Sequence, residues 1–259
     1  VAKNPTSVVF LVLSVCVYLA ISFIFINRTS FLVDEGDHSK TISEIATSQV
    51  NEETFSRNAQ LPGYYFLMSI FYYLGINSLS GLRFVQLIIS LLCIFVFMWS
   101  LKTRGQKEKY IKTWQLLTFP YLSIFFVLVY TDVLSLLLVL FCFALMRRKH
   151  FFLSAITGLL SILVRQNNVI CLLYFCLYHF LENYGFNIKF QKYIFYIKDV
   201  FWFVLPLGFT AIFLYINKGA ALANSYASPL SFHVENIFFF LFSVTLLFLP
   251  QVIFNLKKI

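Results

Sequence analysis

Long stretches of apolar residues, separated by shorter polar segments, run along almost the whole chain. We expect eight of them to cross a bilayer as helices, for which ~20 residues are typical: 7–27, 79–101, 113–130, 133–146, 151–164, 169–181, 200–216 and 237–254. The first stretch is too long for the apolar core of a signal peptide and lacks a small-residue cleavage site, so we interpret it as an uncleaved anchor. The pattern therefore predicts an all-α fold, a polytopic bundle of transmembrane helices.

One further apolar segment, 61–75, is shorter than most of the others and begins with Pro62 and Gly63. These residues favour a short helix in the membrane interface rather than a span. The preceding residues 36–49 have a weak amphipathic spacing, which is typical of a helix lying on a membrane surface. We therefore expect residues 28–76 to form a loop with interfacial helices.

The distribution of charge predicts an orientation for the spans. Basic residues gather in four polar segments: 102–112, 147–149, 189–198 and 257–258. Lys and Arg are enriched in cytoplasmic loops, so we expect these segments and both chain ends on the cytoplasmic side. The acidic segment 28–60 then falls on the opposite face. This orientation requires an odd number of crossings over 61–101, which assigns 61–75 to the interface.

Composition supports a membrane protein, because 60% of the 259 residues are apolar and only 12% are charged. Soluble domains are about half apolar and a quarter charged, and disordered chains are more polar still, so both classes are excluded. The net charge of +9 is explained by the basic loops, and no nucleic-acid partner is expected. The five cysteines lie in apolar stretches without a CxxC motif, which predicts small core residues rather than disulfides or zinc ligands.

Three carboxylates and an imidazole follow the first span within five residues: Asp34, Glu35, Asp37 and His38. A solvated loop explains these charges. A general base explains them as well, because neighbouring carboxylates raise one another's pKa toward neutrality. In a helix, Asp34 and His38 would share a face at the i, i+4 spacing that metal ligands often use. The sequence leaves these interpretations open.

Two further polar sites interrupt the apolar stretches. Asp132 follows Tyr130 and Thr131 and is either functional or a cap of the next helix. The second site is a run of four strong hydrogen-bonding residues: Arg165, Gln166, Asn167 and Asn168. An arginine suits phosphate or carboxylate and the amides suit hydroxyl-rich ligands, whereas a polar turn with a snorkelling arginine is the alternative.

Arg83, at the start of the span 79–101, is either a headgroup anchor or a phosphate contact. His233 lies in the polar loop 217–235, on the same expected face as the other polar sites. One face thus collects carboxylates, arginine, amides and histidine. An enzyme would need this arrangement if a lipid-linked substrate entered its site from the bilayer.

Several blocks can be compared with known families: VDEGDH at 33–38, LPGYY at 61–65, LRFV at 82–85, FP at 119–120 with YTD at 130–132, VRQNNV at 164–169, and NKG at 217–219 with FH at 232–233. In this order they resemble the Alg-ten/Die-two family of the GT-C superfamily. That family comprises endoplasmic-reticulum α-1,2-glucosyltransferases that add the last glucose to the lipid-linked N-glycan precursor. The resemblance covers nearly the whole chain. It implies a single GT-C-type transmembrane module over 1–259, as a short or truncated member.

The resemblance implies an inverting transfer in the membrane of the endoplasmic reticulum, with a lumenal active site and without a metal or other cofactor. Glucose would pass from dolichyl-phosphate glucose to a dolichyl-pyrophosphate oligosaccharide. Asp34, or as second choice Glu35, would be the base, and Arg165, with Arg83 as the weaker candidate, would contact the phosphate. The remaining residues expected to bind substrate are Asp37, His38, Asp132, Gln166, Asn167 and His233.

Other functions remain compatible with the residues. A different GT-C enzyme, such as a mannosyltransferase, would carry similar groups, because the hexose cannot be read from them. A lipid or sugar transporter would have ionisable residues in the middle of its spans and broken helices there, whereas the carboxylates here stand at span ends. An inactive fragment is the third alternative.

Overall fold

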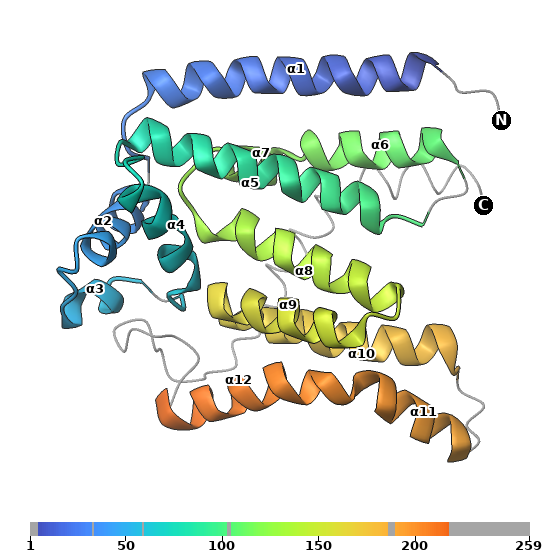
Figure 1. Cartoon of the computed structure of the whole chain (residues 1–259). Coiled ribbons are helices and arrows are strands. Elements are labelled where there is room, and N and C mark those ends of the chain that lie inside the picture. Colours follow the sequence, from blue (N-terminus) through green and yellow to red (C-terminus); the bar gives the residue numbers. More distant parts are fainter. Residues whose placement is uncertain (1–4, 33, 59, 103–104, 186–189, 218–259) are drawn as a thin grey trace, which may run out of the picture. The chain divides into compact units, whose positions relative to one another are not determined.

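The computed structural model describes residues 5–32, 34–58, 60–102, 105–185 and 190–217, and every regular element in these ranges is helical (Figure 1). The chain divides into two compact units, Val1–Asn224 and Ser225–Ile259. The second unit, with the expected span 237–254 and His233, lies outside the described residues. The α-helices are α1 Pro5–Arg28, α2 Glu35–Ala46, α3 Glu52–Ser56, α4 Gly63–Tyr73, α5 Leu79–Ser100, α6 Gln106–Leu117, α7 Pro120–Phe125, α8 Thr131–Arg147, α9 Phe151–Val164, α10 Val169–Asn183, α11 Phe190–Val200 and α12 Val204–Asn217, with 3-10 turns η1 Gln166–Asn168 and η2 Phe201–Phe203.

Two helices in the described part of the chain are long and apolar enough to cross a membrane. One is α5, and the other is Tyr193–Asn217, which runs from α11 through η2 into α12. Val12–Arg28 and Phe151–Val164 are apolar but shorter. The all-α prediction is thus confirmed for the described residues, whereas the expected number of eight spans is not.

The span expected at 113–130 is not a single helix. It divides into α6 and α7, and α6 also takes in part of the basic segment that was expected to be a loop. The break falls at Pro120, which has no N–H for the helix and restricts the preceding Phe119 to an extended backbone. Residues 126–130 that follow α7 are not α-helical.

Buried side chains satisfy the backbone of this irregular segment. Ser90 of α5 donates a 2.6 Å hydrogen bond to the carbonyl of Phe126, and the N–H of Val129 donates to the carboxylate of Glu35 at 3.0 Å. Backbone polar groups away from water need such partners, above all inside a membrane. Polar residues on α5 and α2 thus satisfy backbone groups of this non-helical segment.

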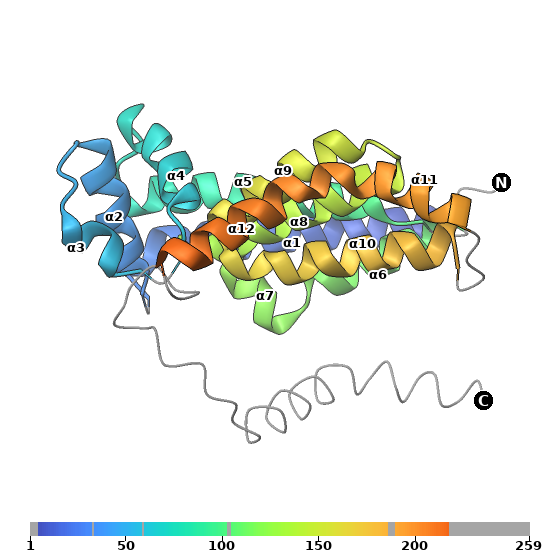
Figure 2. The ribbon, with the colours of Figure 1, turned by 90° about the horizontal axis from the view of Figure 1, so that it is seen from below.

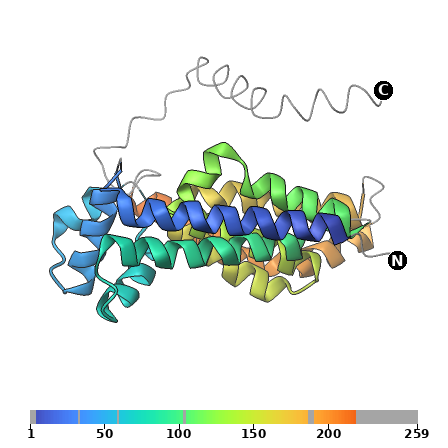
Figure 3. The ribbon, with the colours of Figure 1, turned by 90° about the horizontal axis from the view of Figure 1, so that it is seen from above.

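α8 lies between α5 and α9 and packs on both (Figure 1). α1 runs beside α5 (Figure 3), and α12 lies against α9 (Figure 2). Because α8 begins at the end of the helices that carries α2–α4 and finishes at the other, Asp132 and the basic residues 147–149 lie at opposite ends (Figure 1). The expected orientation likewise assigned Asp132 and these basic residues to opposite faces of the membrane.

The loop 28–76 contains the helices that the amphipathic and apolar spacings predicted, namely α2 and α4. α4 has 11 residues, and a helix of this length extends ~16 Å, about half of the ~30 Å hydrocarbon core. It is too short to cross the core by itself, and its location in the membrane interface stays a prediction.

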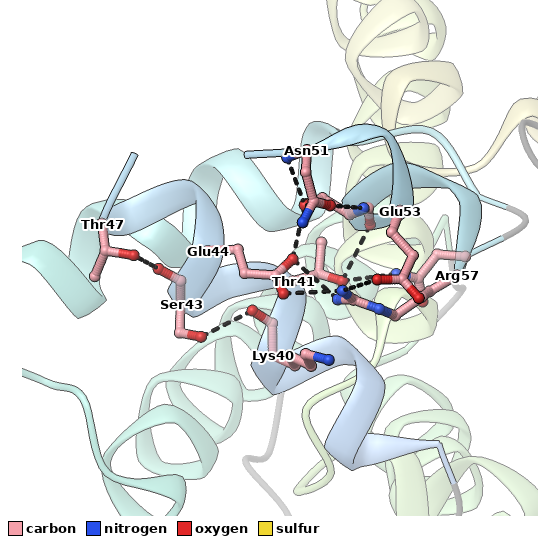
Figure 4. Close-up of polar contacts among 10 residues, drawn as sticks. Lys40, Thr41, Ser43, Glu44, Thr47, Asn51, Glu53 and Arg57 are labelled. Atoms are coloured by element: carbon pink, nitrogen blue, oxygen red, sulfur yellow. Dashed lines mark hydrogen bonds and ion pairs between the residues drawn. The ribbon is translucent and has the colours of Figure 1, made fainter. Parts of the chain in front are cut away.

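A polar network holds α2 and α3 together (Figure 4). Nη1 and Nη2 of Arg57 each donate to the Glu44 carboxylate at 2.9 Å, and the Thr54 hydroxyl donates to it at 2.7 Å. Asn51 and Thr54 form a capping box at the start of α3. The hydrogen bonds from Arg57 lower the pKa of Glu44, so this carboxylate stays charged at neutral pH. The network fixes the loop without using any of the carboxylates at 34–37.

We expect Gly63→Ala to destabilise the protein. A Cβ at this position would lie 2.6 Å from the backbone oxygen of Leu163, at the end of α9. Backbone cannot move aside as a side chain can, so the expected cost is about 1–3 kcal/mol of unfolding free energy, measured as a lower midpoint of thermal unfolding in detergent. Gly36→Ala is the matched control, because nothing lies within 4 Å of its added Cβ. Equal midpoints for the two variants would contradict a close approach of α4 and α9.

Candidate active site

Asp34 stands at the N-cap of α2, and α2 lies at one end of the helices (Figure 1). Its backbone N–H donates a 2.9 Å hydrogen bond to the hydroxyl oxygen of Tyr130, in the segment that precedes α8. The residue is exposed, and its carboxylate makes no capping hydrogen bond to α2. The backbone of Asp34 is therefore held in place while its carboxylate remains accessible.

His38 is buried one turn further along α2, with 4% of its surface exposed. Its Nδ1 lies 2.8 Å from the hydroxyl of Tyr65 of α4, and the two rings are stacked. The ring of Tyr130 meets His38 edge-on, with 4.7 Å between centroids. The imidazole thus joins three segments that are distant in sequence, and one of its neighbours, Tyr130, also accepts the hydrogen bond from Asp34.

Asp132 and Arg165 form an ion pair between the first turn of α8 and the C-cap of α9. Each charge suits the partial charge of the helix end at which it stands. Their side chains are 31% and 32% exposed, so the pair is accessible. Neither Thr131 nor Asp132 is the cap of α8: the N-cap is Tyr130, without a side-chain capping bond.

Contacts place these residues near one another: Tyr130 contacts both Asp34 and His38 and stands two residues before Asp132, which pairs with Arg165. Burial lowers the pKa of His38, and the negative charges of Asp34, Asp132 and Asp37 oppose that shift, while Arg165 adds to it. Four charged residues from α2, α8 and the end of α9 therefore act on one imidazole. The structure brings together five of the residues that the sequence selected.

Glu35 lies next to Asp34 in sequence but is fully buried, in an ion pair with the equally buried Arg83 of α5. Its two oxygens accept four hydrogen bonds: from Arg83 Nε at 2.8 Å, Arg83 Nη2 at 2.5 Å, Val129 N at 3.0 Å and Leu32 N at 3.2 Å.

The guanidinium of Arg83 is equally engaged, because it also donates to the backbone oxygens of Thr29 and Ser30 and to the Thr29 hydroxyl. Every nitrogen of Arg83 thus has a partner within the protein. The geometry gives both residues a part in joining α2 to α5, and it leaves them poorly placed to contact a substrate.

The three amide side chains of residues 166–168 differ in their exposure and contacts. Gln166 is half-buried and Asn167 is exposed, in the η1 turn that follows Arg165. Asn168 turns inward, where its Nδ2 donates to the Ser135 hydroxyl and to the Ser161 carbonyl at 2.8 Å each. Asn168 therefore holds the turn, and Asn167 is presented beside the ion pair.

The sequence did not select Tyr65 and Tyr130, although both stand in the compared blocks. A polar neighbour at the end of an apolar segment is the signal that could have found Tyr130, which stands beside Thr131 at the end of 113–130. Tyr65 lies between Tyr64 and Phe66 and has no such signal. His233 lies outside the described residues. Among the residues that the structure describes, no three His, Cys, Asp or Glu side chains are placed to hold a metal ion.

The lowered pKa of His38 predicts a pH dependence of stability. The unfolded chain takes up a proton near the ordinary value of 6.5, whereas the folded protein does so only at lower pH. The neutral ring therefore contributes fully above about pH 6.5. That contribution is lost as the pH falls from there through the lowered pKa.

We expect the thermal midpoint to fall less steeply over this window in His38→Gln than in the wild type. The control is His150→Gln, because His150 is exposed at the N-cap of α9. Identical slopes for all three proteins would mean that His38 is not buried as described.

Comparison with known proteins places the chain in a family. No curated protein and no solved structure matches it. Residues 59–194, more than half of the chain, match the model of the DIE2/ALG10 family. The matched range includes Tyr65, Arg83, Tyr130, Asp132 and Arg165. The chain therefore belongs to the DIE2/ALG10 family, the membrane glycosyltransferases of dolichol-linked oligosaccharide assembly.

Proposed function

We propose that the chain is an inverting glucosyltransferase. It transfers glucose from dolichyl-phosphate glucose to the terminal glucose of the dolichyl-pyrophosphate oligosaccharide, forming an α-1,2 bond at the lumenal face of the endoplasmic reticulum. One observation carries the proposal: an accessible carboxylate, Asp34, lies near the accessible Asp132–Arg165 ion pair, because Tyr130 contacts Asp34 and the buried His38 and stands two residues before Asp132. Family membership supports the same reaction class.

The reaction needs one base and one group that stabilises the leaving phosphate. Asp34 takes the proton of the acceptor 2-hydroxyl while the hydroxyl oxygen forms a bond to C1 of the donor sugar. The bond between C1 and the phosphate oxygen breaks, and dolichyl phosphate leaves with the electron pair. Attack opposite the leaving group converts the β-linked donor into an α-linked product.

Asp34 is a better base than its two neighbours for structural reasons. The oxygens of Glu35 already accept four hydrogen bonds in a buried ion pair, and a proton would break that pair. Asp37 is exposed, but its backbone has no hydrogen bond to another described segment like the one from the Asp34 N–H to the Tyr130 hydroxyl. A base must be held within hydrogen-bonding reach of its substrate, and the contact with Tyr130 supports Asp34 in this role.

Arg165 is the group that we assign to the leaving phosphate. Its Nη1 is bonded to Asp132, which orients the guanidinium, and a guanidinium has five N–H groups in all. Donors aimed at developing negative charge are usually the largest contribution to such a transfer. Asp132 is then a positioning residue, and Gln166 and Asn167 in the adjoining turn would contact sugar hydroxyls or phosphate oxygens.

The proposal is tested by comparing donors. The full chain is produced in membranes that lack their own terminal glucosyltransferase, and it is supplied with a lipid-linked acceptor that ends in glucose. We expect transfer from dolichyl-phosphate glucose with an α-1,2 linkage in the product. Transfer from dolichyl-phosphate mannose instead would identify another glycosyltransferase of the same superfamily, and transfer from neither donor would contradict the proposal.

A further inference from the structure

A pocket of about 600 Å³ lies where α5, α8 and α10 end, at the opposite end of α8 from Asp132. Its lining comes from the last residues of these helices and from the turn after α8. We call it the basic pocket; its ionisable and amide residues are Lys102, Arg147, Arg148, Lys149, His179, Glu182 and Asn183.

The lining of the basic pocket is strongly cationic. Four of its side chains are Lys or Arg, whereas Glu182 is the one carboxylate among the residues that the structure assigns to the lining. Glu182 lies 3.8 Å from Lys102 at the rim and offsets that charge in part. His179 is turned toward Asp199 of α11 and Asn183, and so belongs to the wall. The remaining excess of positive charge favours an anion.

The two arginines are held in position by the end of α5. Arg148 donates to the carbonyl of Trp99 at 2.8 Å, and its guanidinium carbon lies 3.6 Å from the centre of the Trp99 ring. Arg147 donates to the carbonyl of Ser100 at 3.1 Å. Arg148 also donates to the carbonyl of Ala144 at 3.0 Å. A guanidinium has five N–H groups, so these three hydrogen bonds leave both arginines with further N–H groups for a ligand. Donors oriented in advance bind an anion at a smaller entropic cost.

The position of the basic pocket relative to the membrane indicates the source of the anion. α5 is long and apolar enough to span, so its end at Ser100 reaches the level of the lipid headgroups. Trp99, with its amphipathic ring, is typical of that level. Basic pockets between the ends of transmembrane helices bind the phosphates of anionic lipids.

We propose that the basic pocket binds the phosphate of an anionic phospholipid from the adjoining leaflet. The phosphate accepts hydrogen bonds from Arg147 and Arg148, and Lys149 adds charge at the rim. The site lies at the end of the helices away from Asp34. Its occupancy therefore does not depend on the function proposed for the other end.

The test measures lipid binding to the purified full chain in neutral detergent by native mass spectrometry. The probe is phosphatidylglycerol, which has a net negative charge, and phosphatidylcholine, whose phosphate is balanced by a quaternary ammonium, serves as the net-neutral comparison. The main variant combines Lys149→Gly with Arg148→Gln. Lys149 has a φ of 64°, a backbone conformation that glycine prefers, so this exchange removes a charge without straining the turn.

The matched control is Lys107→Ala combined with Lys109→Ala, because α6 carries these lysines outside the basic pocket. Both double variants lose the same charge.

We expect phosphatidylglycerol to bind the wild type more tightly than phosphatidylcholine does. The pocket variant should weaken this binding by roughly tenfold, and the α6 variant by less than about twofold. Equal weakening in both variants would show that only the net charge of the protein matters, and it would overturn the proposal. Equal binding of the two lipids to the wild type would overturn it as well. Displacement of the lipid by added inorganic phosphate would assign the pocket to a soluble anion instead.

Discussion

Asp34→Asn is expected to lower turnover by about 10²–10⁴-fold, the usual effect of losing a general base. The amide keeps the shape of the side chain, and the backbone bond to Tyr130 does not depend on it. Because the proton moves only in the transition state, the KM for dolichyl-phosphate glucose should change little. The measurement is initial rate against donor concentration, with the amount of folded protein matched between variants.

Two other variants separate the base from its surroundings. Asp37→Asn removes an exposed carboxylate from the same helix and should lower turnover far less. Arg165→Ala should raise the donor KM as well as lower turnover, because the donor phosphate is charged before and during the reaction. If Asp37→Asn were the inactive variant, the site would stand but the base would be Asp37. If Asp34→Asn kept full turnover, the proposed mechanism would fail.

Glu35→Gln is expected to cost about 3–5 kcal/mol of unfolding free energy, the usual effect of breaking a buried ion pair by removing one partner. The change leaves the Arg83 guanidinium charged and buried, with both side chains 0% exposed. It also weakens the bond that ties Val129 to α2. Since a native domain is stable by only about 5–15 kcal/mol, we expect a large fall in thermal midpoint and in the yield of folded protein.

The control for this prediction is Glu53→Gln, which removes a 74% exposed carboxylate paired with Arg57 at 3.6 Å. Exposed pairs contribute about 0–1 kcal/mol, so the midpoint should barely change. The double variant Glu35→Gln with Arg83→Gln removes both charges and should recover part of the lost stability. A single Glu35→Gln variant as stable as the Glu53→Gln control would show that the pair is not buried.

Much of the helical architecture could be predicted from apolar length. The helix expected at 151–164 has the same limits in the structure, and 61–75 contains a short helix. The span expected at 113–130 failed because local hydropathy says nothing about how backbone groups are satisfied. Pro120 breaks the helix, and Ser90 of α5 supports the segment that follows.

The sequence alone determined which polar residues stand at the ends of apolar segments, because charge is excluded from the hydrocarbon core. It could not distinguish Asp34 from Glu35, which are adjacent carboxylates in one motif. Only the tertiary structure separated them: neighbours on a helix point in different directions, and the face that carries Glu35 meets Arg83, 48 residues away. The pairing of Asp132 with Arg165, 33 residues apart, likewise arises from the packing of α8 on α9. Local periodicity defines the faces of a helix, but the partner of each face depends on how the helices pack.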